Sequence, residues 1–208
     1  MFEHQINQGE TLVSAIMSTT KTEIGKAHTT AIGNVLTSTF NTFNKIRKDK
    51  TRSEAEQNHL ILKNLKPKVA DLDGLLVIAR EQAALKAESI KNQMLNESGN
   101  KSEFMSYMML KEIRDSKNPG KLIQSDKSFY KILSDAPAAM LNMSNRTKAS
   151  TLESAAAYHF SDLNTERLNL FHTHNDSFSE LGKMIGVLTK GIETIENSPA
   201  QATRFVPD

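Results

Sequence analysis

Apolar residues recur along this chain at intervals of three and four, the spacing that places side chains on one face of an α-helix. The pattern is sustained in three long stretches and predicts helices over about 8–48, 52–97 and 150–197. The middle stretch is the most regular, and its apolar stripe is Leu62, Leu65, Val69, Leu72, Leu76, Ala79, Ala83, Ala87, Ile90 and Met94. This alternation of three and four is typical of a coiled-coil seam. Pro67 lies inside the stripe and is expected to kink the helix or divide it in two.

Helix starts are predicted from capping boxes, in which a Ser, Thr or Asn is followed three residues later by Glu. Four such pairs are Asn7 with Glu10, Thr51 with Glu54, Asn100 with Glu103 and Ser150 with Glu153. Residues 99–149 contain shorter helical patterns, the first of which is expected to stop at Pro119–Gly120. These pieces are too short to be stable alone, so they must pack on one another or on the long helices.

The expected fold is all-α: an elongated bundle of three long helices, with a small helical insert between the second and the third. Each long helix has an apolar stripe that it can bury only against the others or against another chain. Residues 1–208 are expected to form one domain, which ends in an extended tail at 198–208.

Several positions are candidates for contact with another protein. The insert is rich in methionine, at Met105, Met108, Met109 and Met140. Methionine fills irregular cores and adaptable interfaces, so this cluster is either core filler or a partner-docking surface.

Two further features could also serve an interface. Gly182 and Gly186 make a smooth patch on the last helix, suited to close packing within the bundle or, second, to a subunit interface. Phe205 and Val206 are the large apolar residues of the tail, and we expect them to dock into a groove on a neighbouring subunit or another protein.

The composition restricts the chemistry that this chain can perform. It has no Cys, which excludes disulfides, thiol catalysis and Cys-ligated metals. The sequence also lacks a nucleophile elbow, a Gly-rich phosphate loop, an HExxH motif and paired catalytic carboxylates. We therefore expect neither enzymatic activity nor a cofactor.

The stretch LFHTHNDSF, residues 170–178, contains two histidines and an aspartate within five positions, which makes it the main candidate for a metal or catalytic site. His172 and His174 are two residues apart on a helix, about 200° around its axis, and so they cannot share a metal. His174 falls on the apolar stripe, which predicts a partly buried histidine hydrogen-bonded to a neighbouring helix. A pH-sensitive packing contact is the alternative.

A basic turn follows the first long helix and consists of Lys45, Arg47, Lys48, Lys50 and Arg52. It is a candidate phosphate or nucleic-acid contact, but cations at the end of a helix also suit its dipole. The net charge of +2 gives no global reason to expect nucleic acid as a partner.

The sequence shows neither a secretory signal nor an apolar run long enough to span a membrane, so we expect a soluble protein made in the cytoplasm.

The segment KLIQSDKSFYKILSDAPAAMLNMS, followed by a long charged helix, resembles small helical proteins encoded among bacteriophage structural genes. The likeness covers at most residues 121–195 and implies a virion or assembly component without supplying site residues. The first hypothesis is therefore a structural or assembly protein, a bacteriophage virion component that forms a homo-oligomer and also contacts other structural proteins of the assembly. The alternatives are an adaptor or effector that binds a partner through the Met-rich insert, and a protein that contacts nucleic acid through residues 45–52.

Overall fold

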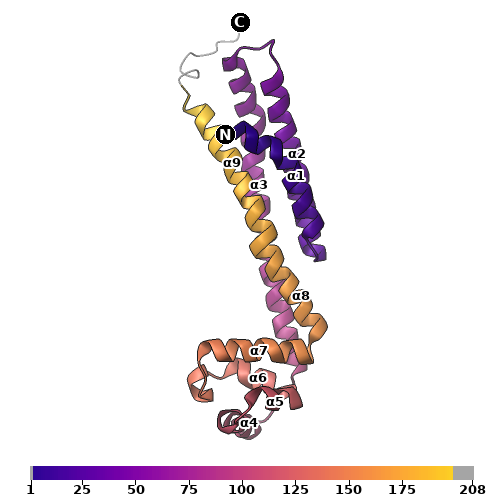
Figure 1. Ribbon diagram of the computed structural model, residues 1–208, viewed down its shortest axis with the longest axis vertical. Coiled ribbons are helices and arrows are strands. Elements are labelled where there is room, and N and C mark those ends of the chain that lie inside the picture. The colour runs from indigo at the N-terminus through magenta and orange to yellow at the C-terminus, as the bar shows by residue number, and fades with distance from the viewer. Residues whose placement is uncertain (1, 199–208) are drawn as a thin grey trace. The chain divides into compact units, whose positions relative to one another are not determined.

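A computed structural model describes residues 2–198 of the chain, with the side chains of residues 11–198 (Figure 1). The helices are α1 (Phe2–Thr19), α2 (Glu23–Lys48), α3 (Glu54–Glu97), α4 (Glu103–Asp115), α5 (Pro119–Ser125), α6 (Ser128–Asp135), α7 (Asn145–His159), α8 (Ser161–His172) and α9 (Phe178–Glu196). A 3-10 turn, η1 (Ala138–Leu141), precedes α7, and a π-helical segment, η2 (Thr173–Ser177), joins α8 to α9. The described residues contain no strand, which confirms the all-α prediction.

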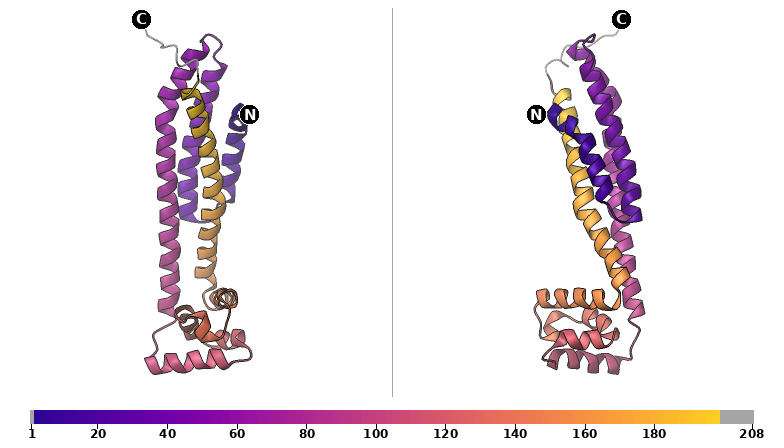
Figure 2. Two further views of the ribbon diagram at one scale, coloured as in Figure 1. Left: turned by 90° about the vertical axis from the view of Figure 1, so that its left-hand side faces the viewer. Right: turned by 45° about the vertical axis from the view of Figure 1, so that its right-hand side comes forward.

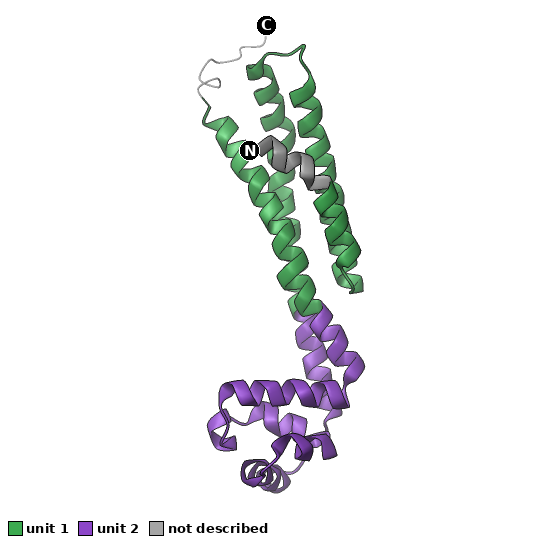
Figure 3. Ribbon diagram, viewed as in Figure 1, with its two compact units in different colours: residues 1–84, 170–208 green, residues 85–169 purple. Residues whose placement is uncertain are grey.

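The chain divides into two compact units (Figure 3). Unit 1 consists of residues 1–84 and 170–208, and unit 2 consists of residues 85–169. In unit 1, the long helices α2, α3 and α9 pack together, and α1 packs on α2 and α9. Its buried core includes Ile32, Leu36, Phe40, Phe43, Leu65, Leu72, Leu76, Phe178, Leu181, Ile185 and Leu188.

The first predicted long helix is interrupted, so the prediction of one helix over 8–48 is wrong. It is replaced by α1 and α2, which pack side by side (Figure 2). The break occurs because threonine hydroxyls compete for backbone groups. Thr20 donates to the Ile16 carbonyl over 3.0 Å, and the Thr22 hydroxyl accepts from the Gly25 backbone N–H over 3.0 Å as the cap of α2.

The prediction of the second long helix is the most accurate of the three. The stripe from Leu65 to Ala83 is buried as expected, although Ile61 is fully buried at the N-terminal end where Leu62 was predicted. Helix α3 runs unbroken through Pro67, so of the two alternatives there, a kink or a division, the division is wrong. Pro67 is exposed, as is Lys63, whose carbonyl loses its usual N–H partner on the outer side of the helix.

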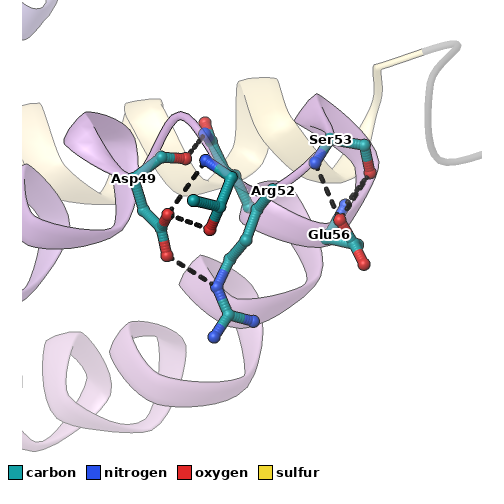
Figure 4. Close-up of polar contacts among 6 residues, drawn as sticks. Asp49, Arg52, Ser53 and Glu56 are labelled. Atoms are coloured by element: carbon teal, nitrogen blue, oxygen red, sulfur yellow. Dashed lines mark hydrogen bonds and ion pairs between the residues drawn. The ribbon is translucent and has the colours of Figure 1, made fainter.

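The start of α3 lies two residues later than predicted (Figure 4). The capping box is formed by Ser53 and Glu56: the Ser53 hydroxyl accepts from the Glu56 N–H over 3.3 Å, and the Glu56 carboxylate accepts from the Ser53 N–H over 2.7 Å. Thr51 donates instead to the Asp49 carboxylate, so the predicted pair of Thr51 with Glu54 is wrong.

The third predicted helix, 150–197, is also wrong in its extent. Helix α7 begins at Asn145, capped by Ser144, whose hydroxyl accepts from the Thr147 N–H over 3.0 Å. It ends at His159, because the next residue, Phe160, has a non-helical backbone and a buried ring that packs edge-to-face on Tyr130, with the ring centres 5.3 Å apart. From Ser161 the chain is helical to Glu196, through the π segment.

Unit 2 has its own core, formed where α4, α5, α6, η1 and α7 pack on one another. Its buried residues include Met109, Ile113, Ile123, Phe129, Leu133, Leu141 and Phe160. Two local predictions are wrong here. Ser102 rather than Asn100 caps α4, and Pro119 begins α5 rather than stopping the preceding helix, because proline suits the first helical turn.

Candidate protein-binding surface

Helix α4 turns large apolar side chains away from the core of unit 2. Its inward face carries Met109 and Ile113, which are 6% and 0% exposed. Phe104, Met105, Tyr107 and Met108, by contrast, are 70%, 46%, 63% and 45% exposed. We call these four residues the α4 surface. Because each residue turns a helix by about 100°, Phe104 and Met108 lie opposite the buried Ile113.

The orientation of the α4 surface is determined by the ends and the buried face of the helix. The Ser102 hydroxyl accepts from the Met105 N–H over 3.3 Å, and Ser116 ends the helix. Met109 and Ile113 then anchor one side, which leaves the opposite side to water. Isolated exposed apolar residues are common, but a contiguous group of large ones is typical of an interaction site.

A groove adjoins the α4 surface within unit 2. It has a volume of about 310 Å³ and is lined by Gly99, Asn100, Lys101, Ser106, Tyr107, Leu110, Ser128, Lys131, Ile132, Asp135 and Ala136. Tyr107 belongs to both the groove and the α4 surface. The groove also carries lysines and an aspartate, of which Lys131 donates to Asn100. A partner could therefore find apolar and charged contacts next to each other.

The predicted methionine cluster is split by the structure. Met105, Met108 and Met140 are exposed, with Met140 58% exposed on η1, whereas Met109 belongs to the core. Core filling thus describes Met109, and partner docking stays a prediction for the three exposed methionines. Phe104 and Tyr107 were missed by sequence reasoning. The signal was present in the helical phase, since Tyr107 lies about 200° around the helix from Met109, and Phe104 lies about 180° from Ile113.

The predicted glycine patch is also divided. A side chain at Gly182 would place its Cβ 3.2 Å from both Leu76 and Arg80 of α3, so this glycine permits close packing of α9 on α3. The same test at Gly186 finds no described atom within 4 Å. Phe205 and Val206, the predicted docking residues of the tail, lie outside the described residues.

His174 is partly buried, as predicted, but it does not lie on the buried stripe, because the π segment shifts the helical phase. Thr173 and Ser177 take the buried positions, and His172 is exposed. The ring of His174 lies 3.4 Å from the side chain of Asn175, next to it in the chain. The predicted hydrogen bond from His174 to a neighbouring helix is therefore wrong.

Buried hydroxyls surround this segment in unit 1. The Thr20 hydroxyl lies 3.2 Å from that of Ser177 and 3.5 Å from that of Thr29, and the Thr22 hydroxyl lies 3.5 Å from that of Thr173. All five residues are buried. These contacts satisfy polar groups inside the bundle and provide a structural explanation for the cluster.

The basic turn is divided between contacts within the chain and solvent (Figure 4). Arg52 pairs with Asp49 over 2.8 Å, and the Arg47 guanidinium lies 5.6 Å from the centre of the Phe43 ring. Hydrogen bonds from Thr51 and from Arg52 hold the pKa of the Asp49 carboxyl below its usual range. The three lysines, Lys45, Lys48 and Lys50, are exposed, and contact with phosphate stays a prediction for them.

Comparisons do not link these features to a known protein. No protein-family model, curated protein or solved structure matches the chain significantly. Over the part of the chain that the structure describes, no cluster of His, Asp and Glu could hold a metal ion. Within the same residues, no helix has the length and apolar character needed to cross a membrane.

Proposed function

We propose that this chain acts by binding other proteins, as a structural or assembly protein, and that the α4 surface is one of its contact sites. The particular form that we propose is a bacteriophage virion component that assembles into a homo-oligomer. The resemblance of residues 121–195 to phage structural proteins suggests this setting. The proposal includes no catalytic step.

The observation that carries the proposal is the outward side of α4. Fully burying a Phe or Met side chain stabilises a contact by roughly 1.5–3 kcal/mol, and Phe104 and Met108 are in large part exposed. Tyrosine is common among the residues that dominate binding energy, and Tyr107 lies beside them at the edge of the groove. A partner that covered this side would remove several large apolar groups from water at once.

An adaptor or effector role is the second candidate, and the groove beside the α4 surface favours it. A concave site next to an apolar patch suits an inserted side chain or helix of a different protein. The two functions predict different behaviour of the purified chain. An assembly protein should form oligomers through the α4 surface without any added protein. An adaptor should not use this surface until its partner is added.

The test uses substitutions on the exposed side of α4. Changing Phe104 and Met108 together to Glu should abolish the oligomers that form through the α4 surface, or co-assembly with virion proteins, as measured by light scattering and pull-down. Circular dichroism should be unchanged because both positions are exposed. Met109 is not changed, since it is buried and its loss would disturb the fold.

A matched pair of single variants provides the control. Tyr107 and Tyr158 both belong to unit 2 and are each 63% exposed, but only Tyr107 lies on the α4 surface. We expect Tyr107→Glu to weaken binding and Tyr158→Glu to leave it unchanged. Equal binding by all these variants would exclude the α4 surface as a contact site. Mass spectrometry of purified particles would then test the virion setting separately.

A further inference from the structure

Helix α3 has a second face that its own unit does not use. Six residues of unit 1 lie along it, namely Lys63, Pro67, Ala70, Gly74, Val77 and Glu81, and all are exposed. Their spacing alternates four and three, as in a coiled-coil seam, and we call this face the outer seam. It lies opposite the buried stripe that includes Leu72 and Leu76. Ile78 flanks the outer seam and is 47% exposed.

Gly74 is the most informative residue of the outer seam. Glycine inside a helix costs about 1 kcal/mol relative to alanine. No described atom lies within 4 Å of a Cβ placed on Gly74, so packing within the chain gives no reason for it. Its neighbour Val77 is 54% exposed. A small residue beside exposed β-branched ones suits the close approach of another helix.

We propose that the outer seam binds the outer seam of a second copy of this chain, with the two α3 helices antiparallel. The six positions are symmetric about residue 72. In an antiparallel pair centred there, Lys63 of one copy faces Glu81 of the other, Pro67 faces Val77, and Ala70 faces Gly74. A two-fold interface requires such self-complementarity, because the same patch contributes from both subunits.

The residue sizes along the outer seam and the charges at its two ends favour a second copy over an unrelated protein. The exposed Asp71 and Asp73, on either side of the centre of the outer seam, would each meet the same residue of the other copy, which limits the affinity of the dimer. The outer seam is basic at one end and acidic at the other, so antiparallel pairing brings Lys63 and Glu81 together twice. The two smallest residues, Ala70 and Gly74, meet at the centre, where the backbones must approach most closely. Val77 then covers Pro67 of the partner copy.

This contact deepens the proposed function by naming one partner, but it does not use the α4 surface. The outer seam spans residues 63–81, a length of about 27 Å at about 1.5 Å per residue. Interfaces of such limited size are weak. Self-association should therefore be measured by analytical ultracentrifugation of the full chain, up to roughly millimolar concentration, with the α4 surface already changed by Phe104→Glu and Met108→Glu.

The main variants introduce charge or bulk. Changing Val77 and Ile78 to Glu should abolish the dimer, whereas Leu12→Glu, at a position 49% exposed on α1, should not. Gly74→Gln should weaken the dimer without lowering the thermal stability of the monomer, because the site is open within the chain. Circular dichroism confirms that each variant is folded.

Charge reversal distinguishes a second copy from any other partner. Lys63→Glu and Glu81→Lys should each weaken the dimer roughly tenfold, since each replaces two attractive pairs by two repulsive ones. The double variant should recover the original affinity, because both copies then carry both changes and each reversed charge again faces an opposite one. A different partner protein would not carry the compensating change. A monomer at the highest concentration, a dimer insensitive to Val77→Glu with Ile78→Glu, or a double variant as weak as the singles would each overturn the proposal. None of these outcomes bears on binding by the α4 surface.

Discussion

The α4 surface in unit 2 and the outer seam in unit 1 are both exposed faces of helices that also pack into a core, but they differ in composition. The α4 surface consists of two aromatic residues and two methionines, all large. The outer seam combines small residues with opposite charges at its two ends. Large adaptable side chains suit partners of varied shape, whereas a symmetric pattern of size and charge suits the same surface on another copy. Exposure alone therefore does not define the kind of contact.

The sharpest test of the inward and outward sides of α4 compares two adjacent methionines. Met109→Glu should lower the free energy of unfolding by about 3–5 kcal/mol, because it buries an unpaired charge. Met108→Glu should change it by less than about 0.5 kcal/mol, as at most exposed positions. Urea denaturation measures both. If the two variants were equally destabilised, α4 would not have the orientation described here.

A second pair of variants compares a packed glycine with the open one of the outer seam. A Cβ on Gly25 would lie 2.5 Å from the Thr22 hydroxyl, 2.6 Å from Thr173 and 2.7 Å from Thr20. Gly25→Ala should therefore destabilise unit 1 by about 1–3 kcal/mol through overpacking. Gly74→Ala should stabilise it by about 0.5–1 kcal/mol, through better helix propensity. Thermal melts of the two variants should shift in opposite directions, and a shared direction would contradict this account.

The smallest expected effect concerns the capping box formed by Ser53 and Glu56. This box fixes the start of α3, the helix that carries both the buried stripe and the outer seam. Hydrogen bonds from the Ser53 backbone N–H and hydroxyl lower the pKa of the Glu56 carboxyl. A lowered pKa means that the contribution is present above the usual pKa of Glu and is lost as the pH falls through the folded value. The advantage of the unmodified chain over Glu56→Gln in thermal melts should thus shrink between pH 6 and pH 3. A constant difference would show that ionisation is unimportant.

Much of the fold could be predicted from apolar spacing, because that spacing reports which side of a helix is buried. Helix α3 was predicted to within two residues at its start, and its predicted end agrees with Glu97. The breaks at Thr20–Thr22 and Phe160 could not be predicted in the same way. At the first, hydroxyls bond to the local backbone, and at the second an aromatic ring packs on Tyr130. Both depend on side-chain geometry rather than on period.

The candidate site was predicted only in part. Composition drew attention to the methionines of α4, but it could not separate the buried Met109 from the exposed Met108. That separation needs the helical phase, which is fixed by packing against α6 and η1. The outer seam was missed because its residues are mostly small or charged and resemble an ordinary solvent-exposed face. Only the exposure of Val77 and the open space at Gly74 indicate it.

Because of the π segment, which side chains of α9 are buried depends on the number of residues in Thr173–Ser177 more than on their identity. A π turn accommodates one extra residue, so every position after it is rotated by about 100° relative to a regular helix. Leu181, Ile185 and Leu188 are buried with that extra residue in place. Losing one residue from Thr173–Ser177 would turn all three away from the core, while replacing the exposed His172 would move none of them. Over evolutionary time, this segment should therefore tolerate substitutions far more readily than single-codon insertions or deletions.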